Sequence, residues 1–292
     1  MSSRSPRISV IVPAYNEANY LSRCLSSLKR QRTKTPYEII VVDNNSTDST
    51  AKIAKRFGVR VVNEKIPGVC AARQRGLKNA KGSIIVSTDA DANFPIDWLT
   101  RIETVLTSDQ AVVGVGGAIR YVDAPRWAPF WTGGLFGASY LSYRIFSQPF
   151  YISACNLAFK RSAFHGYNLK LNQGGDELEV LRQLRQRGTV VFDLNNVVET
   201  SSRRLKKGFV YNVFITFFLY YLLGYSLSQI TKRRILASYP AIRTIPTAPQ
   251  ISPLYLGILT AMCSLVLIRL GRTGHLHLPH TPGLHLPRRV TT

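Results

Sequence analysis

The chain has 292 residues, of which 45% are hydrophobic and 18% charged, and its formal net charge at pH 7 is +22. This composition excludes a disordered chain, and the length is enough for one large α/β domain with residues left over. From Thr200 onward the chain has Arg and Lys but no Asp or Glu. The anionic partner that this charge predicts is a membrane surface or a phosphorylated lipid rather than nucleic acid, because long apolar runs fill the same region.

The first third of the chain alternates short apolar runs with amphipathic stretches. Strands are predicted at Ile8–Val12, Tyr37–Val42, Val59–Val62 and Ser83–Val86. Helices are predicted at Glu17–Lys29, after the polar turn Asn44–Asp48, and at Pro67–Ala80. Such β-loop-α units predict an α/β fold with a doubly wound, largely parallel sheet and right-handed crossovers.

The cysteines show neither Cys-x-x-Cys pairing nor a spacing suited to zinc, so we expect reduced thiols in a cytosolic domain. They are Cys24, Cys70, Cys155 and Cys263. The apolar run Ile8–Val12 is too short for the core of a signal peptide and is followed at once by Pro13. We therefore expect no secretion signal there.

An Asp-x-Asp pair follows the predicted strand Ser83–Val86. Two carboxylates two residues apart in extended chain point the same way, and α/β sheets bind ligands at the carboxyl ends of their strands. Asp89 and Asp91 therefore suit a hard divalent cation, Mg2+ or Mn2+, that carries phosphate oxygens. The hypothesis is a metal-bound nucleoside diphosphate whose attached group is transferred, and a solvated turn is the alternative.

The loop after the first strand contains no glycine. A dinucleotide-binding fold needs Gly-x-Gly-x-x-Gly at this point, and a P-loop needs a Walker lysine. Residues 12–17 read Val-Pro-Ala-Tyr-Asn-Glu instead. Because both common phosphate cradles are missing, the cation at Asp89 and Asp91 has to hold the phosphates.

Five blocks in consistent order resemble the family 2 glycosyltransferases, whose fold is GT-A. They are Ser9–Glu17, Glu38–Asp48, Asp89–Asp91, Asn156–Phe164 and Gly175–Glu179. The resemblance covers roughly residues 8–204. It implies that residues 1–204 are a GT-A-like catalytic domain that binds a nucleotide sugar and uses Mg2+ or Mn2+.

The resemblance implies a nucleotide site built largely from the first two blocks. Pro13, Ala14 and Tyr15 would line the pocket for the base, and Tyr15 could stack on it. Glu17 and Asp43 would accept hydrogen bonds from ribose hydroxyls or the base. The alternatives are an acid at a helix N-terminus for Glu17 and an Asx-turn for Asp43.

The resemblance also assigns Arg73 to the nucleotide or its phosphates, Asp89 to the ribose or the metal, and Asp91 to the metal. Arg73 could instead be a solvated helix residue. Arg203 or Arg204 is expected either to close over the diphosphate or to flank a membrane helix.

For the transfer itself, the resemblance implies an in-line displacement at the anomeric carbon and a carboxylate that removes the acceptor proton. Glu177 falls on the position of the family's base, with Asp176 as the fallback. The chain has Asp-Glu where the family usually has Glu-Asp, so both stay candidates, and two acids that merely open a helix are the alternative. His165 is expected to pack or cap a turn rather than to bind metal.

The C-terminal third contains the candidate membrane segments. Residues 208–231 carry no charge and can span about 30 Å of hydrocarbon as a helix. With a second run at Leu254–Ile268, they make residues 205–272 a predicted membrane-associated helical segment, and an amphipathic hairpin is the alternative. Residues 273–292 are expected to be disordered. The aromatic stretch Pro125–Tyr151 is expected to be a helical cap on the sheet or an interfacial segment that feeds a lipid acceptor to the site.

The sequence thus predicts a membrane-associated, metal-dependent, inverting glycosyltransferase with its catalytic domain on the cytoplasmic face. The expected donor is a nucleotide-diphosphate sugar, and the expected acceptor is a lipid-linked or cell-envelope glycan or a polyprenyl phosphate. Two other classes stay open. A sugar-phosphate nucleotidyltransferase normally has a glycine-rich loop after the first strand, which is missing here, and a non-catalytic membrane-bound scaffold would bind no donor.

Overall fold

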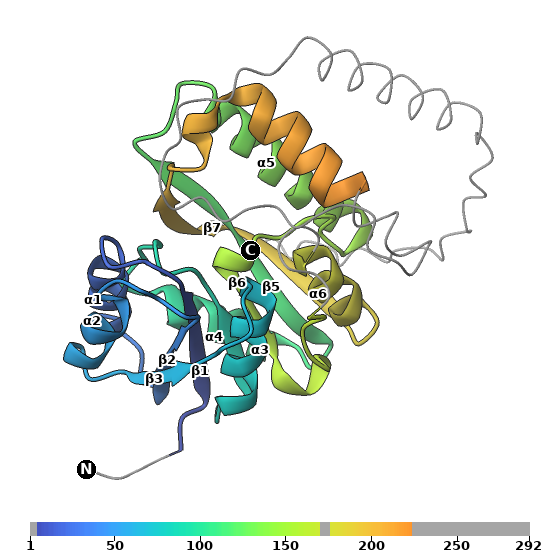
Figure 1. Cartoon of the computed structure of the whole chain (residues 1–292). Coiled ribbons are helices and arrows are strands. Elements are labelled where there is room, and N and C mark those ends of the chain that lie inside the picture. Colours follow the sequence, from blue (N-terminus) through green and yellow to red (C-terminus); the bar gives the residue numbers. More distant parts are fainter. Residues whose placement is uncertain (1–4, 170–175, 224–292) are drawn as a thin grey trace. The chain divides into compact units, whose positions relative to one another are not determined.

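The computed structural model describes residues 5–169 and 176–223, which form an α/β fold around one seven-stranded sheet (Figure 1). The strands are β1 (Ile8–Ala14), β2 (Tyr37–Asp43), β3 (Arg60–Asn63), β4 (Ile84–Ser87), β5 (Val112–Val122), β6 (Leu157–Lys160) and β7 (Thr189–Ser201). The α-helices are α1 (Leu21–Lys29), α2 (Thr50–Arg56), α3 (Val69–Asn79), α4 (Trp98–Ser108), α5 (Ala128–Phe146) and α6 (Asp176–Arg185).

The strands lie in the order β3-β2-β1-β4-β6-β5-β7. Parallel pairs join β1 to β2 and β4, β2 to β3, and β5 to β7. β6 runs antiparallel to both of its neighbours, β4 and β5. The predicted doubly wound, largely parallel sheet is therefore confirmed, with β6 as the one reversed strand in the described part of the chain.

Helices cover both faces of the sheet, which is why the strands read as continuous Val and Ile runs rather than as alternating patterns. Buried side chains of α1, α2 and α4 form one apolar cluster with the sheet. Those of α3, α5 and α6 form a second cluster. The carboxyl ends of the parallel strands are left between these layers, as the fold class predicts.

α1 begins at Leu21, four residues later than the predicted start at Glu17. The carbonyl oxygen of Glu17 accepts hydrogen bonds from the N–H groups of Tyr20 and Leu21, at 3.0 and 2.9 Å. Asn16 has a φ of 53°, in the left-handed region. The chain therefore turns at the sheet edge, and Glu17 lies four residues before the first residue of α1.

After β7 the chain passes through a short 3-10 turn, Leu205–Lys207, into a π-helix, Tyr211–Leu223. This helix lies beside α5, orange against green in Figure 1. Edge-to-face ring contacts join Trp127 to Phe209 and Trp131 to Phe217, with centroids 5.4 and 5.2 Å apart. The aromatic stretch between Pro125 and Tyr151 thus contains a helix, α5, that packs on both the sheet and the helix Tyr211–Leu223.

Within residues 5–169 and 176–223, no helix is both long enough and apolar enough to cross a membrane. The span predicted at residues 208–231 extends past the described part. The second apolar run, residues 254–268, and the predicted disordered tail, residues 273–292, lie wholly outside it.

Candidate active site

The carboxyl ends of β1 and β2 bring the first predicted donor residues together. Ala14 at the end of β1 pairs in register with Asp43 at the end of β2. The Oδ1 atom of Asp43 accepts a hydrogen bond from the backbone N–H of Ser46, three residues on, at 3.3 Å. Tyr15, directly after β1, has 36% of its surface exposed. Pro13 and Ala14 are the last two residues of β1, and Tyr15 is the first residue of the loop that follows. The residues predicted to line the base pocket therefore lie at the end of this strand.

The loops after β1 and β2 are tied to each other. The backbone N–H of Asn16 donates to Ser46 Oγ at 3.0 Å, and the N–H of Thr47 donates to Asn16 Oδ1 at 2.8 Å. The Asp48 carboxylate accepts a hydrogen bond from the N–H of Ala18 at 3.1 Å. This set of contacts explains the left-handed Asn16 and fixes the turn that positions Glu17.

Asp89 and Asp91 lie in the loop that follows β4, as predicted from the sequence. Contacts from two other elements hold this loop. The Thr88 hydroxyl donates to the Cys155 carbonyl at 2.9 Å, and Cys24 Sγ of α1 lies 3.6 Å from the carbonyl oxygen of Asp89. Other elements therefore fix the backbone that carries the two carboxylates, and 39% of the Asp89 side chain stays exposed.

Arg73 of α3 is buried, with 3% of its surface exposed. Its Nη2 donates to Asp89 Oδ1 at 2.8 Å, and its Nη1 donates to Asp176 Oδ2 at 2.7 Å. Burial alone would lower the pKa of Arg73, but the two carboxylates outweigh it and raise the pKa, so the guanidinium stays charged. The interpretation of Arg73 as a solvated helix residue is wrong.

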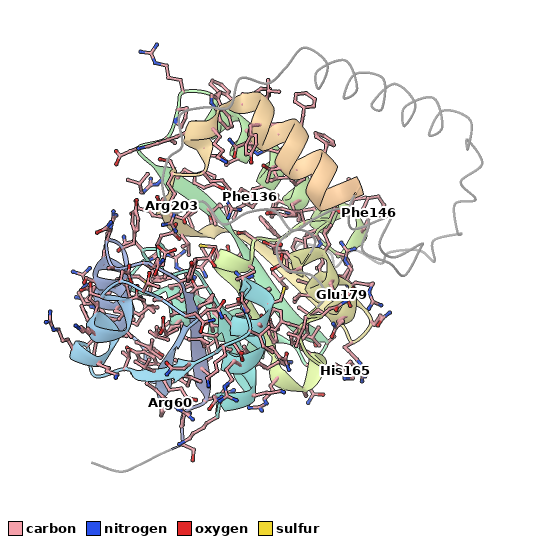
Figure 2. The ribbon with its side chains drawn as sticks, in the orientation of Figure 1. Arg60, Phe136, Phe146, His165, Glu179 and Arg203 are labelled. Atoms are coloured by element: carbon pink, nitrogen blue, oxygen red, sulfur yellow. The ribbon has the colours of Figure 1, made fainter. Side chains whose placement is uncertain are left out.

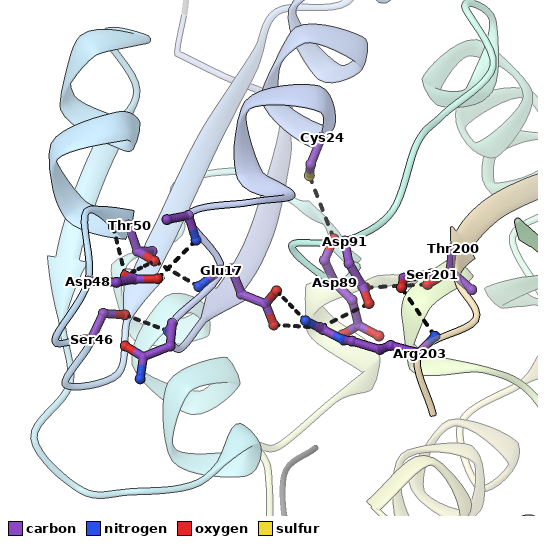
Figure 3. A network of polar contacts seen from close by, with 12 residues as sticks. Glu17, Cys24, Ser46, Asp48, Thr50, Asp89, Asp91, Thr200, Ser201 and Arg203 are labelled. Carbon is purple, nitrogen blue, oxygen red and sulfur yellow. Dashed lines mark hydrogen bonds and ion pairs between the residues drawn. The ribbon is translucent and has the colours of Figure 1, made fainter. Parts of the chain in front are cut away.

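Arg203, just after β7, binds two other acids of the site (Figure 3). Its Nη1 and Nη2 donate to the two carboxylate oxygens of Glu17 at 2.8 and 2.6 Å, and Nη2 also lies 3.0 Å from Asp91 Oδ2. Its guanidinium carbon is 4.8 Å from the centroid of the Tyr20 ring. The Thr200 hydroxyl donates to Asp91 Oδ1 at 3.3 Å.

The Asp91 carboxyl lies in a strongly perturbed environment. Burial raises its pKa to about 6, the positive charge of Arg203 opposes that rise, and the negative charges of Asp89 and Glu17 add to it. A buried carboxylate next to other carboxylates is unfavourable without a cation beside it. In this structure the guanidinium of Arg203 is in contact with Asp91, and the charge of Arg204 also acts on it.

α6 opens with the two acids predicted for the acceptor side, Asp176 and Glu177, and both are buried. Asp176 is engaged by Arg73. Burial raises the pKa of Tyr151, and the nearby carboxylate of Glu177 raises it further, so the aromatic stretch after α5 reaches this part of the site. Arg73 thus joins Asp176 of α6 to Asp89, which links one predicted acceptor-side acid to one predicted donor-side acid.

Sequence reasoning missed the ion pair between Arg203 and Glu17, which are 186 residues apart. It placed Arg203 either over a diphosphate or beside a membrane helix, and it left Glu17 to a ribose or a base. The available signal was a pair of arginines directly after a strand whose carboxyl end lies at the edge that holds the acids. His165 Nε2 lies 2.7 Å from Arg187 Nη2, just past the end of α6, and Figure 2 shows His165 away from Arg203.

In the described part of the chain, no group of three or more His, Cys, Asp and Glu side chains could hold a metal ion by itself. Mg2+ and Mn2+ are often held by one or two carboxylates, with phosphate oxygens and water completing the coordination. Asp89 and Asp91 supply two carboxylates on one loop, so the donor set fits a cation that arrives with a diphosphate.

Residues 9–167 match the family model described as Glycosyl transferase family 2, which is more than half of the chain. The chain belongs to glycosyl transferase family 2. The matched region includes β1–β6, Arg73 and the Asp89–Asp91 loop, but it ends before α6 and Arg203. The family match therefore covers the predicted donor side of the site and stops short of the acids that open α6.

Glycosyltransferase AglE of Haloferax volcanii is 36% identical to this chain over 129 residues, which are 41% of this chain and 42% of that protein. Dolichol-phosphate mannosyltransferase of Pyrococcus furiosus is 32% identical over 114 residues, 37% of this chain and 32% of that protein. The chain therefore aligns with less than half the length of these members of the family.

The solved structure of the mannosyltransferase PcManGT from Pyrobaculum calidifontis, in complex with GDP-Man and Mn2+, is similar to this chain with a TM-score of 0.58 and 19% identity. The likeness covers 94% of this chain and 77% of that one. It concerns the fold, and the GT-A-like fold predicted from the sequence is confirmed.

Proposed function

We propose that this chain is an inverting glycosyltransferase that takes a sugar from a nucleoside-diphosphate donor with the help of Mg2+ or Mn2+. One observation carries the proposal: the Asp89–Asp91 loop lies at the carboxyl edge of the sheet, and the guanidinium of Arg73 joins its Asp89 to Asp176, an acid that opens α6. Membership of the family supports the reaction class. The GDP-Man and Mn2+ of the similar mannosyltransferase support the donor class and the cation.

The nucleoside would bind at the ends of β1 and β2. The Asp43 carboxylate can accept a hydrogen bond from a ribose hydroxyl, and the exposed Tyr15 can stack on the base beside Pro13 and Ala14. Asp89 and Asp91 would hold the cation together with the donor's phosphates, and the bound cation supplies positive charge that stabilises the departing diphosphate. Arg73 fixes the Asp89 carboxylate in place.

Glu177 would accept the proton of the acceptor hydroxyl. Asp176, next to it, binds the buried guanidinium of Arg73 through Oδ2. Glu177, which falls on the base position in the family resemblance, is the general base that we propose. With a phosphate acceptor, which is already deprotonated, turnover would not depend on this group.

A lipid-linked acceptor, a membrane surface and a cytoplasmic orientation are part of the proposal. The support is an apolar face of α5 that points away from the sheet: Phe130, Leu141 and Ile145 are 85%, 58% and 62% exposed. They follow helical spacing, and within the described residues a Cβ added at the intervening Gly134 or Gly137 would have no heavy atom within 4 Å. Figure 2 labels Phe146 at the end of the same helix, also exposed. Exposed apolar patches of this kind mark interaction surfaces.

Vesicle flotation tests the membrane part. The full chain should float with vesicles that contain anionic lipid, and the double variant Phe130→Ser/Ile145→Ser should float less. Phe136→Leu, a conservative change on the buried side of α5, is the matched control. Binding that the double variant leaves unchanged would remove α5 from the proposal.

Donor binding and product analysis test the reaction. Thermal shift with UDP-, GDP- and dTDP-sugars should show one donor that stabilises the chain in the presence of Mn2+, and Asp91→Asn should lose that stabilisation. Turnover should release the nucleoside diphosphate. Release of pyrophosphate would indicate a nucleotidyltransferase instead, and failure to bind any donor would indicate a non-catalytic scaffold.

A further inference from the structure

The carboxylate expected to hold the metal is already bound by the protein's own side chains. Asp91 Oδ2 lies 3.0 Å from Arg203 Nη2, and Asp91 Oδ1 accepts a hydrogen bond from the Thr200 hydroxyl at 3.3 Å. A divalent cation that binds Asp91 therefore meets a guanidinium at the same carboxylate. Like charges this close repel strongly in a partly buried site.

Arg203 can leave Asp91 without losing its place in the structure. Its stronger contact is with Glu17, to which Nη1 and Nη2 donate at 2.8 and 2.6 Å. Only one of these nitrogens, Nη2, also contacts Asp91. The backbone is held independently, because the N–H of Arg203 donates to Ser201 Oγ at 3.3 Å and the Ser202 hydroxyl donates to the Asp123 carbonyl at 2.8 Å. A side-chain rotation is enough to part the guanidinium from Asp91.

The two arginines of the site differ in this respect. Arg73 is enclosed, and it binds acids that are held by two separate elements. The Arg203 side chain is 14% exposed and packs on a single ring, that of Tyr20. An incoming cation therefore displaces Arg203 from its carboxylate at a lower cost in free energy than it would displace Arg73.

We propose that Arg203 is a built-in counter-ion that neutralises Asp91 in the donor-free protein and yields this carboxylate to the divalent cation when the donor arrives. This inference rests on the proposed function, which supplies the donor and the cation. Released from Asp91 but still paired with Glu17, the guanidinium faces the diphosphate at the edge of the sheet. The exchange makes the cation and the donor bind together, since the cation alone gains too little from two carboxylates to displace the arginine.

Binding of Mn2+ alone to the full chain, followed by the EPR signal of free Mn2+, tests the exchange without any turnover. Wild type should bind Mn2+ weakly. Arg203→Gln should bind it about tenfold or more tightly, because the guanidinium in contact with Asp91 is then gone and no longer repels the ion. Arg203→Lys, which keeps the charge, should stay near wild type. Arg120→Gln is the matched control, because Arg120 pairs with Glu199 and touches neither Asp89 nor Asp91.

Equal or weaker Mn2+ binding by a folded Arg203→Gln protein would overturn the proposal and leave Arg203 with a structural role only. If Arg203→Gln does not fold because Glu17 loses its partner, the comparison moves to Glu17→Gln with and without Arg203→Gln. The double variant should bind Mn2+ more tightly than the single one, and equal binding would again overturn the exchange.

The same titration repeated with UDP and with GDP separates this inference from the proposed function. Wild type should bind Mn2+ much more tightly with the correct nucleotide present. If no nucleotide improves Mn2+ binding by wild type, the proposed donor site fails, whereas the comparison with Mn2+ alone still reports on Arg203.

Discussion

Two arginine-centred clusters divide the acids of the site between them. Arg73 holds Asp89 and the start of α6, and Arg203 holds Asp91 and Glu17. The two arginines differ in exposure: 4% of the Arg73 side chain reaches water, against 14% of the Arg203 side chain. The comparison shows that neighbouring carboxylates on one loop can serve different purposes, because solvent access decides which guanidinium can be exchanged and which is fixed.

The largest effect should separate the two acids that open α6. With a hydroxyl acceptor, Glu177→Gln should lower turnover by roughly 10²–10⁴-fold because it removes the proton acceptor. Donor affinity should change little. Asp176→Asn should instead act mainly on stability, since its partner is the buried Arg73. Steady-state kinetics with each variant, alongside donor titration, checks this, and an unimpaired Glu177→Gln protein would favour a phosphate acceptor.

Removing the enclosed guanidinium of Arg73 should cost more stability than removing the more exposed guanidinium of Arg203. Arg73→Met leaves Asp176 buried without a cation and should lower the free energy of unfolding by about 3 kcal/mol. The measurement is urea unfolding followed by circular dichroism.

Arg203→Gln should lower the free energy of unfolding by about 1 kcal/mol, since water reaches part of the Arg203 side chain and the amide of Gln can still donate to Glu17. The two variants are to be compared under identical conditions. A loss at Arg203 as large as that at Arg73 would contradict the distinction between the clusters.

A third cluster, around Glu199 of β7, should contribute the least of the three to stability. Arg120 and Arg23 lie 2.5 and 3.1 Å from its carboxylate oxygens, and both arginines are exposed. The hydrogen bond from Arg120 lowers the pKa of Glu199 below its ordinary value. Such a carboxylate stabilises the fold above its unfolded-state pKa, and the contribution disappears as the pH falls through the folded-state pKa.

Glu199→Gln should therefore lower the free energy of unfolding by about 0.5 kcal/mol at pH 7. It should also reduce the loss of stability on acidification below about pH 4.5, the region in which an ordinary Glu titrates. Urea unfolding at pH 7, 5 and 4 with wild type and variant measures both. A variant whose stability falls as steeply as that of wild type would show that this ion pair carries no linked proton.

Much of the fold followed from local pattern. Apolar runs of strand length alternate with helical periodicity up to β4, and this fixed the α/β class and the parallel sheet. The helix start at Glu17 was wrong because its contacts come from elsewhere: Thr50 Oγ1 accepts from its N–H at 2.8 Å, and a turn intervenes before Leu21. Neither contact is visible in a window of local sequence.

The sequence by itself determined the strands β1 to β4, the position of Asp89 and Asp91 at a strand end, and the family, because spacing along the chain encodes strand and helix periods. Only the tertiary structure decided which cation neutralises each acid. Ion pairs form between side chains that packing brings together, and Arg203 meets Glu17 across 186 residues of chain. No periodicity records that distance, so the exchangeable counter-ion of the site became visible only once the sheet was assembled.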